Sequence, residues 1–157
     1  MTRTASGPPL VVDLSNLCRD SRLLPVGVRA DATLLDQFVE ALMDSDIEFG
    51  AVREVADRSL PSLLHPAGKR RLRELEQSGS LEYSSIADER LLELAFGAQA
   101  TASTLVASMD SFDDFRRTYP AIQGTTDRFV GWEPGPDQTI RPFLRDMGVH
   151  THHRLSR

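Results

Sequence analysis

Cysteine is nearly absent from the sequence, because Cys18 is the one cysteine among 157 residues. A lone cysteine excludes a disulfide within the chain and every zinc site that is built from several cysteines. No general base stands at a recognisable spacing from it, so we interpret Cys18 as a structural residue. Cysteine usage of this kind is typical of a reducing compartment, and we expect a cytoplasmic protein.

Long apolar runs are missing as well. No stretch approaches the roughly 20 apolar residues that cross a bilayer, so we expect no membrane segment. Residues 1–9 are rich in threonine, serine, glycine and proline and lack the apolar core of a signal peptide. We interpret them as a flexible N-terminal lead.

A positive net charge is the third absence. The chain has 18 Lys and Arg against 23 Asp and Glu, a formal net charge of −5, which argues against indiscriminate nucleic-acid binding. A nuclease is not excluded, because a site of several carboxylates that holds a cation itself makes the balance negative. The hydrophobic fraction of 40% and the charged fraction of 26% are typical of one folded domain.

Short apolar segments alternate with amphipathic ones along the chain. Strands are expected at residues 10–14, 47–55, 81–84, 104–108 and 128–132. Helices are expected between Asp31 and the 44–46 cluster and at residues 67–77, 87–99 and 112–119. This alternation predicts an α/β fold with three layers and a mostly parallel central sheet. We place the domain at residues 10–132, followed by a Pro-rich extension, 133–157, with little regular pattern.

Acidic residues stand where the predicted strands end and the predicted helices begin. Asp13 ends the first strand and Asp110 follows the fourth, while Asp88 and Glu89 open the helix after the third. Asp114 follows Asp110 by four residues, on the same face if the chain turns helical. Because strand ends and helix starts share the carboxyl edge of a parallel sheet, these acids are expected to converge. Clustered carboxylates repel one another unless a cation neutralises them, and oxygen ligands favour Mg²⁺ or Mn²⁺.

Each acid also has an explanation that involves no function. Asp88 and Glu89 in a first helical turn favour the helix dipole. Asp114 taken alone suits a solvated surface, and Asp57, after the second strand, suits a turn. Asp13 is the exception, because an uncompensated carboxylate directly after an apolar strand is costly.

At these positions the sequence resembles the PIN-like superfamily, in particular its NYN and regnase-like ribonuclease branch. The resemblance spans about residues 10 to 120 and rests on three stretches. These are Val11-Val12-Asp13-Leu14-Ser15-Asn16, residues 87–95 (ADERLLELA) and residues 105–114 (LVASMDSFDD). It implies a PIN-like, Rossmann-like α/β/α domain with Mg²⁺ or Mn²⁺ as cofactor. The metal-site acids that it implies are Asp13, Asp88, Asp110 and Asp114, with Glu89 assisting, and Ser15 and Asn16 would contact substrate or the metal's water.

The function that the resemblance implies is an endoribonuclease that cleaves single-stranded or loop RNA. The sequence departs from the family pattern at three positions. Leu14 replaces a glycine, Glu89 replaces the second acid of an Asp-Asp pair, and Met109 replaces an asparagine. These departures leave two alternatives open: an inactive PIN-like module that binds RNA or protein, and a toxin-type nuclease with a protein inhibitor. A homo-oligomer is also left open.

Basic residues are the second requirement of an RNA enzyme. The densest basic cluster lies on the predicted helix at 67–77, and two arginines follow Asp114; these residues are Lys69, Arg70, Arg71, Arg73, Arg116 and Arg117. Such residues can hold phosphates without reading sequence. Alternatively, the helical cluster is a solvated face interleaved with Glu74 and Glu76.

Two further features are open to interpretation. Phe129 and Trp132 can stack on a base, but on a predicted strand we interpret them as core residues. The last histidines lie in the C-terminal extension, where we favour a polar terminus over a metal site; they are His150, His152 and His153.

Overall fold

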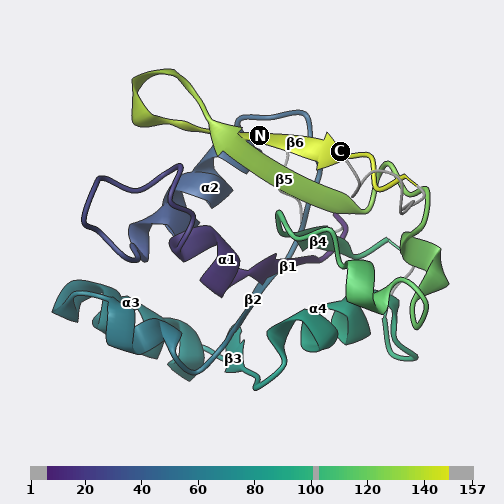
Figure 1. Ribbon diagram of the computed structural model, residues 1–157, viewed down its shortest axis with the longest axis horizontal. Helices are drawn as coiled ribbons and strands as arrows, with labels where there is room; N and C mark the ends of the chain where they lie inside the picture. The colour runs from purple at the N-terminus through teal and green to yellow at the C-terminus, as the bar shows by residue number, and fades with distance from the viewer. Residues whose placement is uncertain (1–6, 101–102, 149–157) are drawn as a thin grey trace, which may run out of the picture.

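The computed structural model describes residues 7–100 and 103–148, and these form one six-stranded sheet with helices on both faces (Figure 1). The strands lie in the order β3-β2-β1-β4-β5-β6, and all neighbours are parallel except β5 and β6. Their bounds are β1 Leu10–Asp13, β2 Val52–Ala56, β3 Leu81–Tyr83, β4 Leu105–Ala107, β5 Phe129–Pro134 and β6 Ile140–Arg145. The predicted α/β/α fold with a mostly parallel sheet is confirmed.

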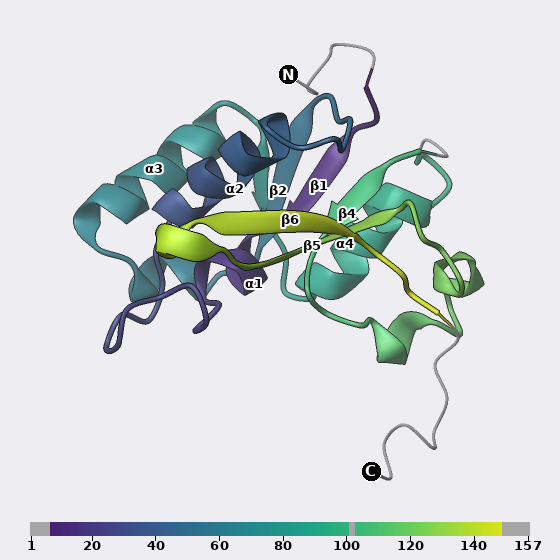
Figure 2. The same cartoon turned by 90° about the horizontal axis from the view of Figure 1, so that it is seen from above.

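In the part of the chain that the structure describes, four α-helices cover the sheet. They are α1 Leu14–Cys18, α2 Thr33–Met43, α3 Pro66–Gln77 and α4 Ala87–Phe96, and short 3-10 helices lie at η1 Leu60–Leu63, η2 Asp113–Phe115, η3 Pro120–Ile122 and η4 Pro136–Gln138. Seen from above, α2 and α3 lie on one side of β1 and β2 and α4 lies on the other (Figure 2). Among the described residues, no helix combines the length and the apolarity that a bilayer span requires.

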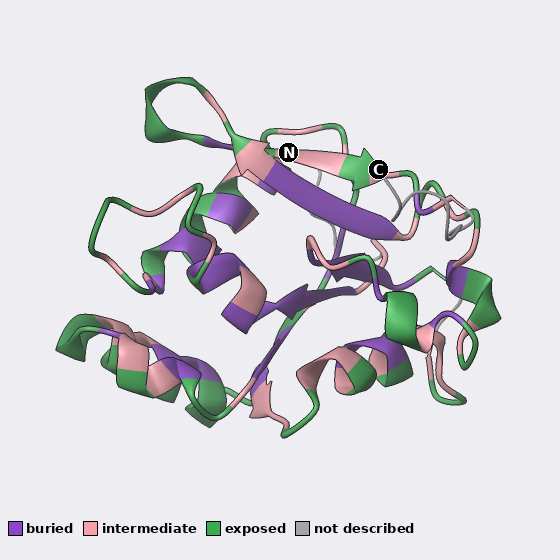
Figure 3. Cartoon of the chain, in the orientation of Figure 1, coloured by how far each residue is buried: buried purple, intermediate pink, exposed green. Residues whose placement is uncertain are grey.

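Alternation along the strands builds two cores. In β1, Leu10 and Val12 pack with α1, α2 and α3, whereas Val11 packs with α4. Because successive strand residues point to opposite faces, a strand that is covered on both sides is apolar throughout. Figure 3 shows this as strands buried along their length at the centre of the sheet, β1 and β4 among them.

The aromatic residues of β5 belong to these cores, as predicted. Trp132 has no exposed surface and meets Phe38 edge to face, with ring centroids 5.4 Å apart. Phe129 is equally buried on the opposite face of the sheet. Cys18 is buried at the end of α1, and burial raises the pKa of its thiol to about 12, which suits a structural role.

Two expectations from the sequence are wrong. The helix expected at 112–119 is limited to the single turn η2, because Phe112 takes a left-handed conformation with φ 55° and its N–H bonds the Asp110 side chain. The segment after Pro134 is not irregular, since β6 pairs with β5 over six residues. Pro142 is tolerated there because β6 is an edge strand with one neighbour. The histidines His150, His152 and His153 lie outside the described residues.

Candidate functional site

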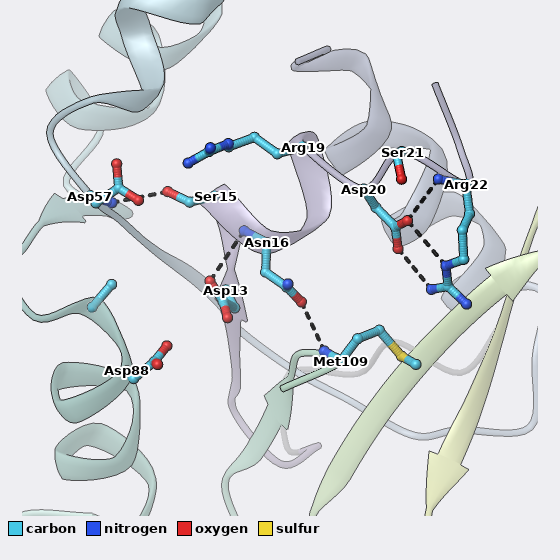
Figure 4. Close-up of a pocket in the computed structure, with 11 residues that line it drawn as sticks. Asp13, Ser15, Asn16, Arg19, Asp20, Ser21, Arg22, Asp57, Asp88 and Met109 are labelled. Atoms are coloured by element: carbon cyan, nitrogen blue, oxygen red, sulfur yellow. Dashed lines mark hydrogen bonds and ion pairs between the residues drawn. The ribbon is translucent and has the colours of Figure 1, made fainter. Parts of the chain in front are cut away.

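The strand order places the candidate site at the centre of the sheet's carboxyl edge. In an order of 3-2-1-4-5-6, ligands collect at the carboxyl ends of strands 1 and 4, where the order of the strands reverses. Asp13 ends β1 there, and residues 108–110 follow β4. A cleft of about 580 Å³ opens at this point, and Asp13, Asp88 and Asp57 line it (Figure 4).

Asp13 links the first strand to the fourth. Its carboxylate caps α1 by accepting the Asn16 N–H at 3.3 Å, and it accepts the hydroxyl of Ser108 at 2.8 Å. The Asn16 side-chain oxygen in turn accepts the N–H of Met109 at 2.9 Å (Figure 4). The Asp13 side chain is held by these contacts, and the residue is 4% exposed. The carboxylate is therefore fixed in place and almost removed from water.

Burial makes ionisation of the acids in this cleft costly. The pKa of Asp13 is raised to about 7, chiefly by burial and in part by the charges of Asp88 and Asp110, while the hydrogen bonds from Ser108 and Asn16 oppose the rise. Burial likewise raises the pKa of Asp88 to about 6, helped by the charge of Asp110, a hydrogen bond between these two carboxyls, and the charge of Asp114. No ion pair compensates Asp13 or Asp88 among the described residues.

Asp110 is held by its own loop and by the last strand. Its carboxylate accepts the N–H of Phe112 at 2.9 Å, and its N–H donates to the Ser108 hydroxyl at 3.1 Å. The guanidinium of Arg145 on β6 donates to the carbonyls of both Ser108 and Asp110 at 2.7 Å. Arg145 is absent from the residues predicted from the sequence, because it lies in the segment that was expected to lack regular structure.

The remaining predicted acids lie at the margin. Asp114 is exposed on η2 and acts on the cluster through its charge on Asp88. Glu89 is exposed in the first turn of α4, and its charge acts on Tyr119, which lies away from the cleft. The structure therefore brings together Asp13, Asp88 and Asp110, with Asp114 nearby, and leaves Glu89 outside.

Ser15, Asp57 and the unpredicted Arg19 shape the far wall of the cleft. The Ser15 hydroxyl accepts the N–H of Asp57 at 3.0 Å, so this side chain is occupied by the fold. Burial acts to raise the pKa of Asp57, but hydrogen bonds from Ser59 and Ser15 and the charge of Arg19 lower it overall. Arg19 is exposed on the same wall (Figure 4), and its guanidinium forms no hydrogen bond or ion pair with another described residue. Its position three residues after Asn16, on the same helical face, was the available signal.

The predicted basic residues are spread over different surfaces. Arg116 is 8% exposed, and its guanidinium donates to Gln123 and to the carbonyls of Ser111, Met147 and Gly148. This gives Arg116 a structural role instead of a position in the cleft. On α3, Arg71 pairs with Asp36 at 2.9 Å, while Lys69 and Arg73 line a second pocket beside β3. Arg70 is exposed on the same helix and lines neither pocket, and Arg117 is exposed beyond η2.

The donor chemistry of the cleft fits a hard cation. Among the described residues, no three His, Cys, Asp or Glu side chains already stand close enough to hold a metal between them. Mg²⁺ does not require that, because it keeps several waters and is bound through one or two carboxylates. The Asp88 and Asp110 pair, next to the buried Asp13, supplies such ligands, and a cation would offset the repulsion that adds to the raised pKa values of Asp13 and Asp88.

Comparison with known proteins supports the fold. No family model matches the chain, and no curated protein sequence does. The chain is similar to the crystal structure of nuclear proteinaceous RNase P 2 (PRORP2) from A. thaliana, with a TM-score of 0.61 and 14% sequence identity. The match covers 88% of this chain and 30% of that chain, so the chain spans less than a third of that protein's length. At this identity the likeness shows the fold alone, in agreement with the expected PIN-like architecture.

Proposed function

We propose that the protein is a metal-dependent endoribonuclease whose active site is the cleft at the ends of β1 and β4. The observation that carries the proposal is the convergence of Asp13, Asp88 and Asp110, two of them with a raised pKa and no cationic partner among the described residues. A fold can keep such a costly arrangement when a cation offsets it. The likeness to the proteinaceous RNase P 2 of A. thaliana supports RNA as the substrate class.

The acids have distinct roles in this proposal. Asp88 and Asp110 would hold Mg²⁺ or Mn²⁺, with Asp13 and Asp114 contributing charge and contacts through water. When bound, the cation would supply a water of lowered pKa and stabilise the charge on the scissile phosphate. Ser108 and Asn16 hold Asp13 in one orientation, so the site is preorganised before substrate arrives.

Two polar side chains of the cleft are placed to bind phosphate. The Asn16 side-chain oxygen accepts the Met109 N–H, which leaves the NH2 group of the Asn16 amide to donate into the cleft. The Arg19 guanidinium lines the same cleft. We assign to Arg19 the phosphate contact that the sequence suggested for Arg116, because the Arg116 guanidinium is occupied by Gln123 and backbone carbonyls.

The test is cleavage of an end-labelled single-stranded RNA by purified protein with Mn²⁺. We expect Asp13→Asn and Asp110→Asn each to reduce the rate about 100-fold or more, as for loss of one electrostatic catalytic group. Asp46→Asn is the matched control, because Asp46 is an exposed acid outside the cleft. Unreduced cleavage by the folded Asp13→Asn protein, or cleavage that persists in EDTA, would contradict the mechanism.

A catalytically inactive PIN-like module that binds RNA is the second candidate. It is favoured by the lack, among residues 7–100 and 103–148, of three potential ligand side chains already gathered for a metal. Thermal unfolding with and without Mn²⁺ separates the two candidates. A midpoint that rises with Mn²⁺ in the natural protein but not in Asp110→Asn supports the nuclease. An unchanged midpoint supports the inactive module.

A further inference from the structure

The basic cluster of α3 is divided by the helix into two surfaces. Lys69 and Arg73, four residues apart, lie on one face of α3 and line a pocket of about 320 Å³ together with Arg58 and Tyr83. Arg71 lies on another side of the helix, where Asp36 of α2 holds its guanidinium at 2.9 Å. The charged run of α3 is thus divided: Arg71 is paired with Asp36, and Lys69 and Arg73 belong to a small basic groove.

The basic groove, lined by Arg58, Lys69, Arg73 and Tyr83, adjoins the acidic cleft. Arg58 directly follows Asp57, which lines the cleft. Tyr83 ends β3 beside Ala56 of β2, and the turn after it leads to α4 and Asp88. Figure 1 shows α3 and α4 on either side of β3, at the same edge of the sheet. A bound single-stranded polymer that leaves the cleft toward β3 therefore reaches the groove next.

The charges of the groove favour an anion. Arg58, Lys69 and Arg73 are exposed, and none forms an ion pair with a described residue, whereas Arg71 and Arg90 nearby are paired. Among the described residues that line the groove, Glu76 is the one carboxylate, so three cations face one anion. Three cations held near a single carboxylate leave an excess of positive charge, and an anionic ligand would relieve the remaining repulsion.

Tyr83 gives the groove an aromatic surface. Its residue is partly buried at the end of β3, and burial raises the pKa of its phenol, with a further contribution from the charge of Glu76. A partly exposed ring beside cations is the arrangement by which proteins bind single strands, since bases stack on the ring while cations follow the phosphates.

We propose that this groove is a nucleotide-binding subsite for single-stranded RNA, which holds the strand where it leaves the cleft. Arg58, Lys69 and Arg73 contact phosphates and Tyr83 stacks on a base. The identity of the ligand as RNA rests on the proposed function, but binding in the groove does not require that the cleft be catalytically active.

The experiment is fluorescence anisotropy of a labelled single-stranded RNA in EDTA, where binding is measured without metal-dependent cleavage. We expect Lys69→Ala and Arg73→Ala each to weaken binding several-fold and to lower the slope of log K against log salt by about 0.7, the value for one lost phosphate contact. Arg70→Ala is the matched control, because Arg70 is an exposed cation of the same helix outside the groove. It should leave the slope unchanged.

Two further variants test the ring and the sign of the charge. Tyr83→Ala should weaken binding about 5-fold or more, while Tyr83→Phe should retain it, because stacking needs the ring alone. Glu76→Gln should strengthen binding, since it removes the one carboxylate of the groove.

The outcomes separate this proposal from the nuclease. Binding that survives in Asp13→Asn but falls in Lys69→Ala supports the groove, even if no cleavage is seen with any metal. Equal losses in Arg70→Ala and Lys69→Ala would overturn the groove, because they would indicate diffuse attraction. Two results together would also overturn it and indicate a bare anion site. Lys69→Ala would weaken the binding of inorganic polyphosphate or an acidic peptide as much as that of RNA, and Tyr83→Ala would leave RNA binding unchanged.

Discussion

Replacement of Asp13 by asparagine should stabilise the metal-free protein at neutral and alkaline pH. Asp13 is 4% exposed, and the pKa of its carboxyl is raised from 3.8 to about 7, chiefly by burial. One pKa unit corresponds to 1.36 kcal/mol, so the ionised side chain costs the native state about 4 kcal/mol. Asparagine carries no charge and does not incur this cost.

The sign of the pH dependence follows from the direction of the shift. Since the native pKa lies above that of the unfolded chain, the native state binds the extra proton between about pH 4 and 7. The natural protein therefore loses stability as pH rises through this window, and the loss is complete above pH 7. The stability of Asp13→Asn relative to the natural protein should increase over the same window.

Hydrogen bonding offsets part of the gain. The side-chain oxygen of the introduced asparagine can still accept the Asn16 N–H. Its NH2 group then faces the Ser108 hydroxyl, which must turn because it donates to Asp13 in the natural protein. A disturbed hydrogen bond costs about 1 kcal/mol. We therefore expect Asp13→Asn to be about 3 kcal/mol more stable than the natural protein at pH 8 and about equal to it, or slightly less stable, at pH 4.

Urea unfolding in EDTA at both pH values measures the difference. Asp46→Asn, an exposed acid, should show no change in relative stability between the two. Addition of Mn²⁺ at pH 8 should stabilise the natural protein more than Asp13→Asn. A stability difference for Asp13→Asn that is the same at pH 4 and pH 8 would refute the reasoning, because it would show that the native carboxylate pays no cost of ionisation.

Two other predictions concern the supports of the site. Arg145→Ala leaves the carbonyls of Ser108 and Asp110 without their donor. It should destabilise the protein by about 2 kcal/mol in urea and reduce RNA cleavage. Arg141→Ala, at an exposed residue of the same strand, should do neither. Gly131→Ala would place a Cβ 2.8 Å from the Met109 sulfur, so we expect a loss of about 1–3 kcal/mol, seen as a lower thermal midpoint that Met109→Ala partly restores.

The central part of the fold was predictable because its sequence signals are local. Residues 10–13 are apolar up to Asp13, which by itself indicates a buried strand that ends at an acid. The helices α3 and α4 follow from helical periodicity, and their ends lie within three residues of the predicted ones. The convergence of Asp13, Asp88 and Asp110 followed from topology, because parallel strands share one carboxyl edge.

What could not be predicted depends on partners far away in the chain. Only Ile140 is buried along β6, and Pro142 argues against a strand, so the sequence there has no clear alternation. Arg145 finds its acceptors 35 and 37 residues earlier, and Arg116 reaches Met147 and Gly148 across 31 and 32 residues. Arg116, which lies near Asp114 in the sequence, is thus a structural residue, while the exposed Arg19 lines the cleft.

The departures from the PIN-like pattern leave the frame of the site in place. Leu14 begins α1 and packs in the core with no exposed surface, so Asp13 still caps the helix through the Asn16 N–H. Met109 binds Asn16 through its backbone, and its sulfur accepts the N–H of Trp132 on β5 at 3.3 Å. An asparagine at 109 would add a polar group to the cleft wall, whereas the Asn16 contact needs only the backbone. The positions of Asp13 and Asp110 therefore depend on Ser108, Asn16 and Arg145, all present in this chain, and the departures at 14 and 109 bear on the wall of the cleft more than on the acids.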